Sequence, residues 1–273
     1  MQNVLSFIEF ALSHADPKTV PKNAEIQFSV GTGGVWKYLW GAHGQICTQK
    51  LLDYEYDHYY KKNGWNRQEY ESITKGWVDD GVRVTDCQGL LDAFLGNNIN
   101  ANSNYNGYCT EKGLIAEIKR PFVIGEAVFN GTATKKTHVG WVCGFLKGDP
   151  LVVEARGLKY GVVITRMSNR VWKYRGLMTK KFSYENVEPQ PEPSHYIFLR
   201  NLRYGCVGDD VIQLKMLLKN AGYDRGITTN TASSRKFGSA TRRLVKDYQR
   251  DNGLTVDGIA GSKTITSLGG IYR

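Results

Sequence analysis

A cysteine at the predicted start of a helix is the residue best suited to chemistry in this sequence of 273 residues. Cys87 stands in VTDCQGLLDAFLG, where Thr85 and Asp86 are good N-cap residues and the apolar residues that follow share one helical face. Unpaired N–H groups and the helix dipole lower the pKa of a thiol at such a position. The pattern predicts that Cys87 is a thiolate nucleophile near neutral pH, with ordinary core packing as the alternative.

A candidate base, His138, follows about fifty residues after Cys87. The segment THVGWVCGFL is rich in β-branched and aromatic residues and predicts a strand with His138 at its start. A turn at 147–150 leads into a second strand, LVVEARG, which contains Glu154. A simple hairpin would put Glu154 opposite residues 141–143, so it would reach His138 only diagonally, with help from twist or a bulge. A surface ion pair between Glu154 and Arg156 is the alternative.

The order DCQGL, HVGWV and VVEARG resembles the NlpC-type cell-wall cysteine peptidases, which have a papain-like fold and relatives among CHAP-type amidases. The resemblance implies an α+β domain in which helices pack on an antiparallel sheet. It also implies that Cys87 is the nucleophile, His138 the general base and acid, and Glu154 the residue that orients the imidazole.

Two aromatic stretches precede the nucleophile. The tetrapeptide YLWG, which contains Tyr38 and Trp40, resembles the tyrosine motif of the same family. This implies that both side chains shape the substrate cleft beside Cys87, although ordinary aromatic core packing is an equal alternative. The polar, tyrosine-rich stretch from Cys47 to Trp77 predicts one or two surface helices that flank the cleft.

The residues on either side of the nucleophile bear on the substrate. In the family, an Asp before the cysteine and a Ser after it lie near the free amino end of the stem peptide. Asp86 matches this pattern, whereas Gln88 replaces the serine. Both remain candidate substrate-binding residues. The bond that is cut stays open between the one after γ-D-glutamate, the lactyl–L-alanine amide and a cross-link.

Composition limits the other classes of function. The five cysteines have no metal-ligand spacing, and we expect neither a metal nor a cofactor. The opening residues 1–17 predict an amphipathic helix rather than a signal peptide, and no apolar run is long enough to cross a membrane. We therefore expect a soluble protein, made in the cytoplasm without a signal peptide, that acts at the cell wall after release.

Proline and charge divide the chain. Three prolines in 189–195 predict a linker between a catalytic domain, 1–188, and a smaller domain, 196–273. Residues 195–273 hold 13 Lys and Arg against 6 Asp and Glu, so most of the net charge of +10 lies there. The segments GDDVIQLKMLL, FGSATRRLVKDYQ and VDGIAGSKT predict helices and resemble the three-helix peptidoglycan-binding domain.

Together these patterns predict a monomeric peptidoglycan hydrolase of the phage or prophage endolysin type that cuts a stem-peptide amide. Bacterial peptidoglycan is the expected partner. Nucleic acid is the alternative for a basic helical domain, and we do not expect it because acidic residues interrupt the basic ones. Two rivals stay open: a wall-binding or structural protein with a degenerate papain-like domain, and a transferase or deamidase that acts on protein.

Overall fold

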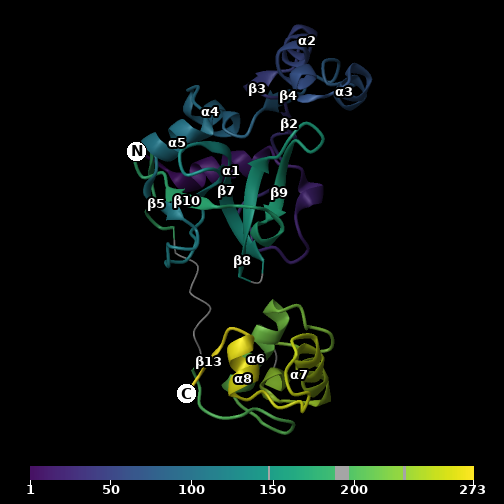
Figure 1. Cartoon of the computed structure of the whole chain (residues 1–273), viewed down its shortest axis with the longest axis vertical. Coiled ribbons are helices and arrows are strands. Elements are labelled where there is room, and N and C mark those ends of the chain that lie inside the picture. Colours follow the sequence, from purple (N-terminus) through teal and green to yellow (C-terminus); the bar gives the residue numbers. More distant parts are fainter. Residues whose placement is uncertain (147, 188–196, 230–231) are drawn as a thin grey trace. The chain divides into compact units, whose positions relative to one another are not determined.

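The computed structural model describes residues 1–146, 148–187, 197–229 and 232–273, and the chain forms two compact units (Figure 1). These are Met1–Gln190 and Pro191–Arg273. The predicted linker, 189–195, lies outside the described residues.

The first unit mixes helices with an antiparallel sheet. Its helical segments are α1 (Val4–Ser13), η1 (Pro17–Thr19), α2 (Gln49–Glu55), η2 (Tyr56–Tyr60), η3 (Lys61–Asn63), α3 (Arg67–Thr74), α4 (Gly89–Leu95), α5 (Ala101–Gly107) and η4 (Met167–Asn169). Its strands are β1 (Gln2–Asn3), β2 (Lys37–Tyr38), β3 (His43–Ile46), β4 (Arg83–Thr85), β5 (Thr110–Leu114), β6 (Ala127–Gly131), β7 (Lys136–Leu146), β8 (Asp149–Ala155), β9 (Val162–Arg166), β10 (Tyr174–Leu177) and β11 (Phe182–Ser183).

Six of these strands form the central sheet, in the order β5-β10-β6-β7-β8-β9. Every neighbouring pair in this sheet is antiparallel. Long β7 and β8 occupy inner positions, and their side chains are almost all buried. The α+β class predicted from the sequence is therefore confirmed.

Helix α1 covers one face of this sheet. Asn3 caps the helix, because its side-chain oxygen accepts a hydrogen bond of 2.8 Å from the N–H of Leu5. The buried residues of α1 recur at helical spacing: Val4, Phe7, Ile8, Ala11 and Leu12. Phe7 meets Trp141 of β7 edge-on, with ring centroids 4.9 Å apart. The predicted N-terminal amphipathic helix is thus a core element.

The strand before Cys87, the predicted nucleophile, belongs to a second, three-stranded sheet with the order β2-β4-β3. Strand β4 pairs with β2 in parallel and with β3 antiparallel. Helix α4 follows β4 after a short turn, and its buried residues join the core that α1 forms with the central sheet. This connection brings Cys87, in that turn, to the central sheet.

Between β3 and β4 the chain forms a helical insert, residues 47–82, which carries α2, η2, η3 and α3 (Figure 1). Its two ends meet, because the N–H of Cys47 donates a hydrogen bond of 2.8 Å to the carbonyl of Val82. The helices predicted here are present, but most tyrosines face inward. The insert contributes most of a separate core: Leu39, Ala42, Cys47, Leu52, Tyr56, Tyr60, Tyr70, Trp77, Val84 and Leu158.

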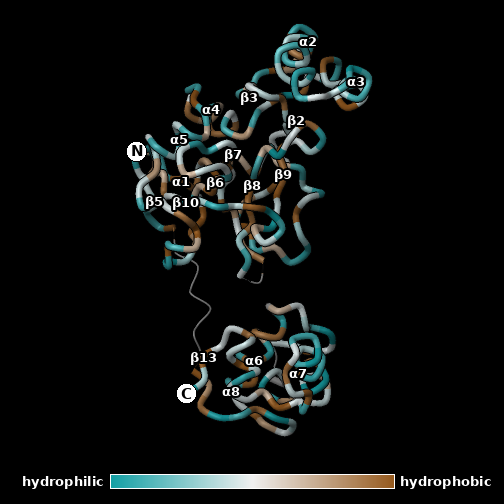
Figure 2. Tube along the Cα trace, in the orientation of Figure 1, coloured by the Kyte–Doolittle hydropathy of each residue, from teal (hydrophilic) through white to brown (hydrophobic). Residues whose placement is uncertain are grey.

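The second unit is helical. Its elements are β12 (Ile197–Phe198), α6 (Asp209–Asn220), η5 (Ala232–Arg235), α7 (Ser239–Asp251), α8 (Ser262–Ser267) and β13 (Ile271–Tyr272). The three predicted helices enclose a core that includes Val211, Leu214, Phe237, Leu244 and Ile265. Figure 2 shows hydrophilic residues along much of α7.

Candidate functional site

Cys87 lies in the turn between β4 and α4. Asp86 caps this turn: its Oδ1 accepts hydrogen bonds from the N–H groups of Gln88, at 3.0 Å, and Gly89, at 2.6 Å. Gly89 packs so closely on Ala42 that a Cβ atom there would lie 1.9 Å from the Ala42 carbonyl oxygen. The hydrogen bonds to Asp86 and the close packing of Gly89 on Ala42 fix the conformation of the turn, and with it the position of the Cys87 sulfur.

The Cys87 thiol is almost entirely buried, with 6% of the residue exposed. Burial raises the pKa of the Cys87 thiol to about 12, and the carboxylate of Asp86 adds to the rise. The N–H groups of Val139 and Gln88 lie close to the sulfur and oppose this effect without cancelling it. This direction is opposite to the one expected from the helix start, because lost hydration outweighs the N–H groups there. The Val139 contact places the sulfur beside β7.

A β-bulge sets the alignment of β7 with β8. The register shifts by one residue between Val142 and Gly144, which leaves Cys143 as the extra residue. With this shift Glu154 lies opposite Gly140 instead of residues 141–143, and the Glu154 Cβ is 3.2 Å from where a Gly140 Cβ would be.

His138 reaches Glu154 diagonally across this strand pair. Its Nε2 donates a hydrogen bond of 2.7 Å to Oε2 of Glu154. Gly140 leaves the intervening space open, since a Cβ there would lie 2.6 Å from Val152 Cγ1 and 3.1 Å from the ring of Trp172. His138 is partly exposed, with 19% of its side chain accessible, whereas the Glu154 side chain is fully buried.

The Glu154 carboxylate has further partners that the sequence did not indicate. Thr165 donates its hydroxyl to Oε1 at 2.7 Å. Arg170 donates Nε to Oε1 at 2.9 Å and an Nη2 hydrogen to Oε2 at 2.8 Å. Burial would raise the pKa of Glu154, but hydrogen bonds from His138 and Arg170 outweigh it and hold the pKa at about 2. The alternative ion pair with Arg156 is not formed; the Arg156 guanidinium lies over the ring of Tyr160 instead.

Trp172 covers the imidazole. Its ring lies nearly parallel to that of His138, with centroids 5.4 Å apart and an interplanar angle of 14°. It packs against the face of the central sheet opposite α1, with Val142 and Val152. The sequence places Arg170 and Trp172 two residues apart, but no spacing rule connects that segment to His138, so both were missed.

The predicted cleft residues occupy different positions. Tyr38 pairs with Thr85 through β2 and β4 and is 9% exposed; burial, with a contribution from the nearby Cys87, raises its pKa well above the ordinary value. Trp40 is 39% exposed and stacks on Tyr59 of the insert, with centroids 4.1 Å apart and rings within 2° of parallel. Cys87 also contributes to a raised pKa of Tyr59, after burial, so this residue belongs to the same neighbourhood.

Gln88 lies elsewhere. Only 2% of it is exposed, its amide donates to Asp92 Oδ1 at 2.9 Å, and its carbonyl oxygen accepts from Asn104 at 2.9 Å. These bonds tie α4 to α5. Both ends of the side chain are therefore engaged inside the protein, which corrects the expectation that Gln88 contacts substrate. Asp86 uses its carboxylate as a cap, and Gly41 N–H donates to its second oxygen at 3.2 Å.

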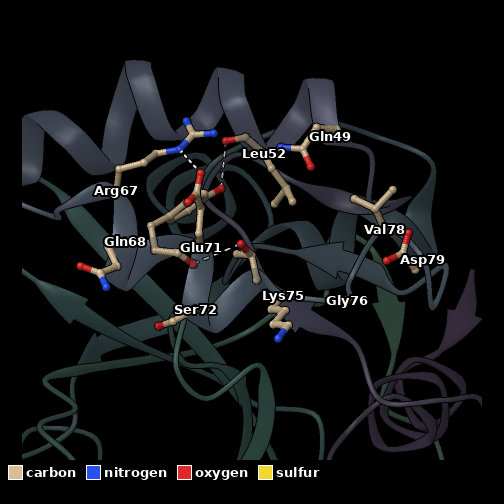
Figure 3. A pocket seen from close by; sticks show the side chains of 12 residues that line it. Gln49, Leu52, Arg67, Gln68, Glu71, Ser72, Lys75, Gly76, Val78 and Asp79 are labelled. Carbon is tan, nitrogen blue, oxygen red and sulfur yellow. Dashed lines mark hydrogen bonds and ion pairs between the residues drawn. The ribbon is translucent and has the colours of Figure 1, made fainter.

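A separate hollow of about 530 Å³ lies in the insert, between α2 and α3 (Figure 3). Arg67 pairs there with Glu71 at 2.6 Å, and none of the predicted site residues lines it. In the described part of the chain no three His, Cys, Asp or Glu side chains gather as metal ligands. None of the helices described is long and apolar enough to span a bilayer.

The second unit has a basic helix face. Arg242, Lys246 and Arg250 follow at i, i+4 and i+8 on α7 and line one shallow hollow. Arg250 pairs with Asp247 at 2.9 Å. The family model described as "putative peptidoglycan binding domain" matches residues 207–268. This part of the chain is a peptidoglycan-binding domain.

The peptidoglycan-binding domain predicted from three helical segments is thus confirmed, and it associates the chain with the cell wall. No family model of an NlpC-type catalytic domain matches the chain.

Two solved structures show weak similarity to the chain. One is a periplasmic domain of the EpsAB fusion protein of the Vibrio vulnificus type II secretion system, at 17% identity and a TM-score of 0.24, over 52% of this chain and 55% of that one. The other is a peptidoglycan-binding protein from Clostridioides difficile in complex with glutamine hydroxamate, at 21% identity and a TM-score of 0.22, over 50% of this chain and 73% of that one. The chain spans little more than half the length of the first, and at these TM-scores neither carries an argument.

Proposed function

We propose that this chain is a peptidoglycan hydrolase whose first unit is a papain-like cysteine hydrolase. The observation that carries the proposal is the contact of His138 Nε2 with Glu154 Oε2 at 2.7 Å on β7 and β8, with the Cys87 sulfur beside the next residue of β7, Val139. A nucleophile, a base and an orienting carboxylate are the parts of an activated thiol site. The peptidoglycan-binding domain supports the cell wall as the place of action.

The reaction follows from these groups. The Cys87 sulfur attacks the carbonyl carbon of a stem-peptide amide while its proton passes to His138. The C–N bond breaks, and the imidazolium returns that proton to the departing amine, which leaves a thioester on Cys87. His138 then removes a proton from water, the resulting hydroxide attacks the thioester carbonyl, the C–S bond breaks to release the acid, and the imidazolium returns its proton to the Cys87 sulfur. Burial raises the pKa of the thiol, so transfer of its proton to His138 is a required part of the attack.

Glu154 orients the base. Its Oε2 accepts from Nε2 of His138, which fixes the imidazole tautomer with the proton on Nε2 and leaves Nδ1 to take the proton of Cys87. Among the described residues Nδ1 has no hydrogen-bond partner of its own. The exposed Trp40 and its stacked partner Tyr59 supply an aromatic wall for the substrate next to the nucleophile.

A single digestion experiment tests the proposal. Purified peptidoglycan is treated with wild type, Cys87→Ala and the control Cys206→Ala, and the fragments are identified by mass spectrometry. We expect fragments from wild type and the control and none from Cys87→Ala. A new L-alanine amino terminus identifies an N-acetylmuramoyl-L-alanine amidase, and a new γ-D-glutamate carboxyl identifies an endopeptidase. If the added protein lyses intact bacteria, or bacteria whose membrane has been damaged, the result would support the phage or prophage endolysin role.

A second candidate is a wall-binding or structural protein with a degenerate papain-like unit. The near-complete burial of Cys87 and its raised pKa favour this alternative. It predicts that every variant sediments with the wall and that wild type releases no fragment from walls of several bacterial hosts.

A further inference from the structure

Arg170 is the second ionic partner of Glu154, beside His138. It follows η4 as the C-cap residue, and its side chain is 27% exposed while that of Glu154 is fully buried. We propose that Arg170 is a positioning residue for hydrolysis: its two-nitrogen grip on Glu154 fixes that carboxylate and balances its charge, so that His138 stays free to accept a proton. The inference rests on the proposed function of this site.

The contacts of the carboxylate leave it one orientation. Oε1 accepts from Thr165 and from Nε of Arg170, at 2.7 and 2.9 Å. Oε2 accepts from His138 and from Nη2 of Arg170, at 2.7 and 2.8 Å. Arg170 thus touches both oxygens, and the planar fork of a guanidinium matches the plane of a carboxylate. A rotation of Glu154 that released His138 would also break the pair with Arg170.

The charge balance follows from burial. A carboxylate out of water is costly unless a cation neutralises it. If His138 were the sole cation available, the buried Glu154 would favour the imidazolium and hold the proton on the ring. Arg170 supplies the positive charge permanently, since a guanidinium does not lose its proton in proteins. The imidazole can therefore cycle between its neutral and charged forms during the reaction.

The other groups near His138 and Glu154 do not supply the permanent positive charge that neutralises the Glu154 carboxylate. On β6, the residue paired with His138 is Asn130, which is neutral. Two residues beyond Glu154, Arg156 packs its guanidinium over Tyr160, 4.1 Å from the ring centroid. Asp86 acts on Cys87 from the turn before α4. Among the described residues, the ion pairs of Glu154 are those with His138 and Arg170.

The same segment also supplies the cover of the imidazole. Trp172, two residues after Arg170, stacks on His138, and the Arg170 guanidinium carbon lies 5.9 Å from the centroid of the Trp172 ring. Arg170 and Trp172 therefore lie on one short stretch of chain that acts on the imidazole in two ways. Arg170 fixes Glu154, which bonds Nε2 of the ring, and Trp172 covers the face of the ring.

Titration of His138 by NMR tests the charge role without any substrate. In a Cys87→Ala background, Arg170→Gln is compared with Arg170→Lys, and Arg166→Gln serves as the control because Arg166 pairs with Asp149, at 2.9 Å, instead of Glu154. We expect Arg170→Gln to raise the midpoint of the His138 titration by about one pH unit, since removal of a nearby cation favours the imidazolium. Arg170→Lys and the control should stay within a few tenths. An unchanged midpoint in Arg170→Gln overturns the inference.

Hydrolysis rates test the positioning role. We expect Arg170→Lys to lower kcat about tenfold at unchanged KM, because an ammonium replaces the fork by one point of contact, and Arg170→Gln to lower kcat further. Equal kcat values for Arg170→Lys, Arg166→Gln and wild type would overturn it. Alkylation of Cys87 by iodoacetamide separates the two proposals: if wild-type Cys87 reacts no faster than Cys206 and no wall is cut, the proposed function fails, whereas the NMR result still reports on Arg170.

Discussion

At the scale of single residues, the ionised Glu154 carboxylate makes the free energy of unfolding depend on pH in the acid range. Its pKa of about 2 lies below the ordinary 4.5, so the unfolded chain binds this proton more readily than the folded one. The stabilisation from its ionic contacts is complete above about pH 4.5 and is lost as the pH falls toward 2. With a fully buried side chain, the difference amounts to about 3 kcal/mol as an order of magnitude.

We therefore expect Glu154→Gln to weaken the dependence of unfolding free energy on pH between 4.5 and 2. The variant should also be less stable at pH 7, because it leaves Arg170 without its counterion. All six tryptophans lie before residue 173, so tryptophan fluorescence in urea reports on the first unit alone. Glu9→Gln, on the exposed side of α1, is the matched control and should follow wild type. Parallel curves for wild type and Glu154→Gln would contradict the expectation.

Sequence patterns located His138 and Glu154 but not the groups that fix their state. The alternation of the hairpin indicates a diagonal approach, yet the bulge at Cys143 and the open space at Gly140 depend on how two strands pack with their neighbours. Arg156 and Arg170 are equal candidates for Glu154 by residue type, and only the fold decides between them. The dipole argument failed at Cys87, because it ignores how much water the surrounding core removes.

At the scale of elements, the insert brings Tyr59 into the electrostatic neighbourhood of Cys87. This tyrosine stacks on Trp40, and the hydroxyl of the next residue, Tyr60, accepts a hydrogen bond of 3.2 Å from the Trp40 N–H. The sequence predicts surface helices in the polar, tyrosine-rich stretch from Cys47 to Trp77. It could not predict that the tyrosines turn inward, since a stretch with so many polar residues does not mark which face meets a neighbour.

If the paired rings form a wall for the substrate, Tyr59→Ala should raise KM and lower kcat/KM about tenfold, the equivalent of roughly 1.4 kcal/mol. Tyr54→Ala is the matched control from the same insert: Tyr54 is 56% exposed and stacks on His58. Soluble muropeptides give both constants directly. A similar loss in both variants would mean that the insert acts through its stability rather than through Tyr59.

At the scale of the whole molecule, the domain that matches the peptidoglycan-binding family and the proposed catalytic site belong to different units, and most of the net positive charge lies in the second. The family match covers residues 207–268 and includes α6, α7 and α8. Arg242 and Lys246 form no ion pair among the described residues, so their charges are available to carboxylates and phosphates of the wall.

Co-sedimentation with peptidoglycan measures how much Arg242 and Lys246 contribute to wall binding. With Cys87→Ala as the parent, which leaves the wall intact, we expect bound protein to fall as NaCl rises, because salt screens exposed charges. A further Arg242→Gln/Lys246→Gln change should weaken binding at low salt by about fivefold, roughly 1 kcal/mol for two exposed charges. Lys236→Gln, exposed elsewhere in the unit, should bind like the parent. Binding that ignores both salt and these residues would assign recognition to another face.

The hydrogen bond between Cys47 and Val82 brings the two ends of the insert together, so the insert can be exchanged as one unit. A segment whose two ends are neighbours can be exchanged for another of the same span without pulling strands β3 and β4 apart, provided that the replacement still covers Leu39, Ala42, Val84 and Leu158. Residues 47–82 are therefore a natural graft site. Replacements built there would alter the surface that Tyr59 and Trp40 form near Cys87, whereas the His138–Glu154 pair on β7 and β8 lies outside the exchanged segment.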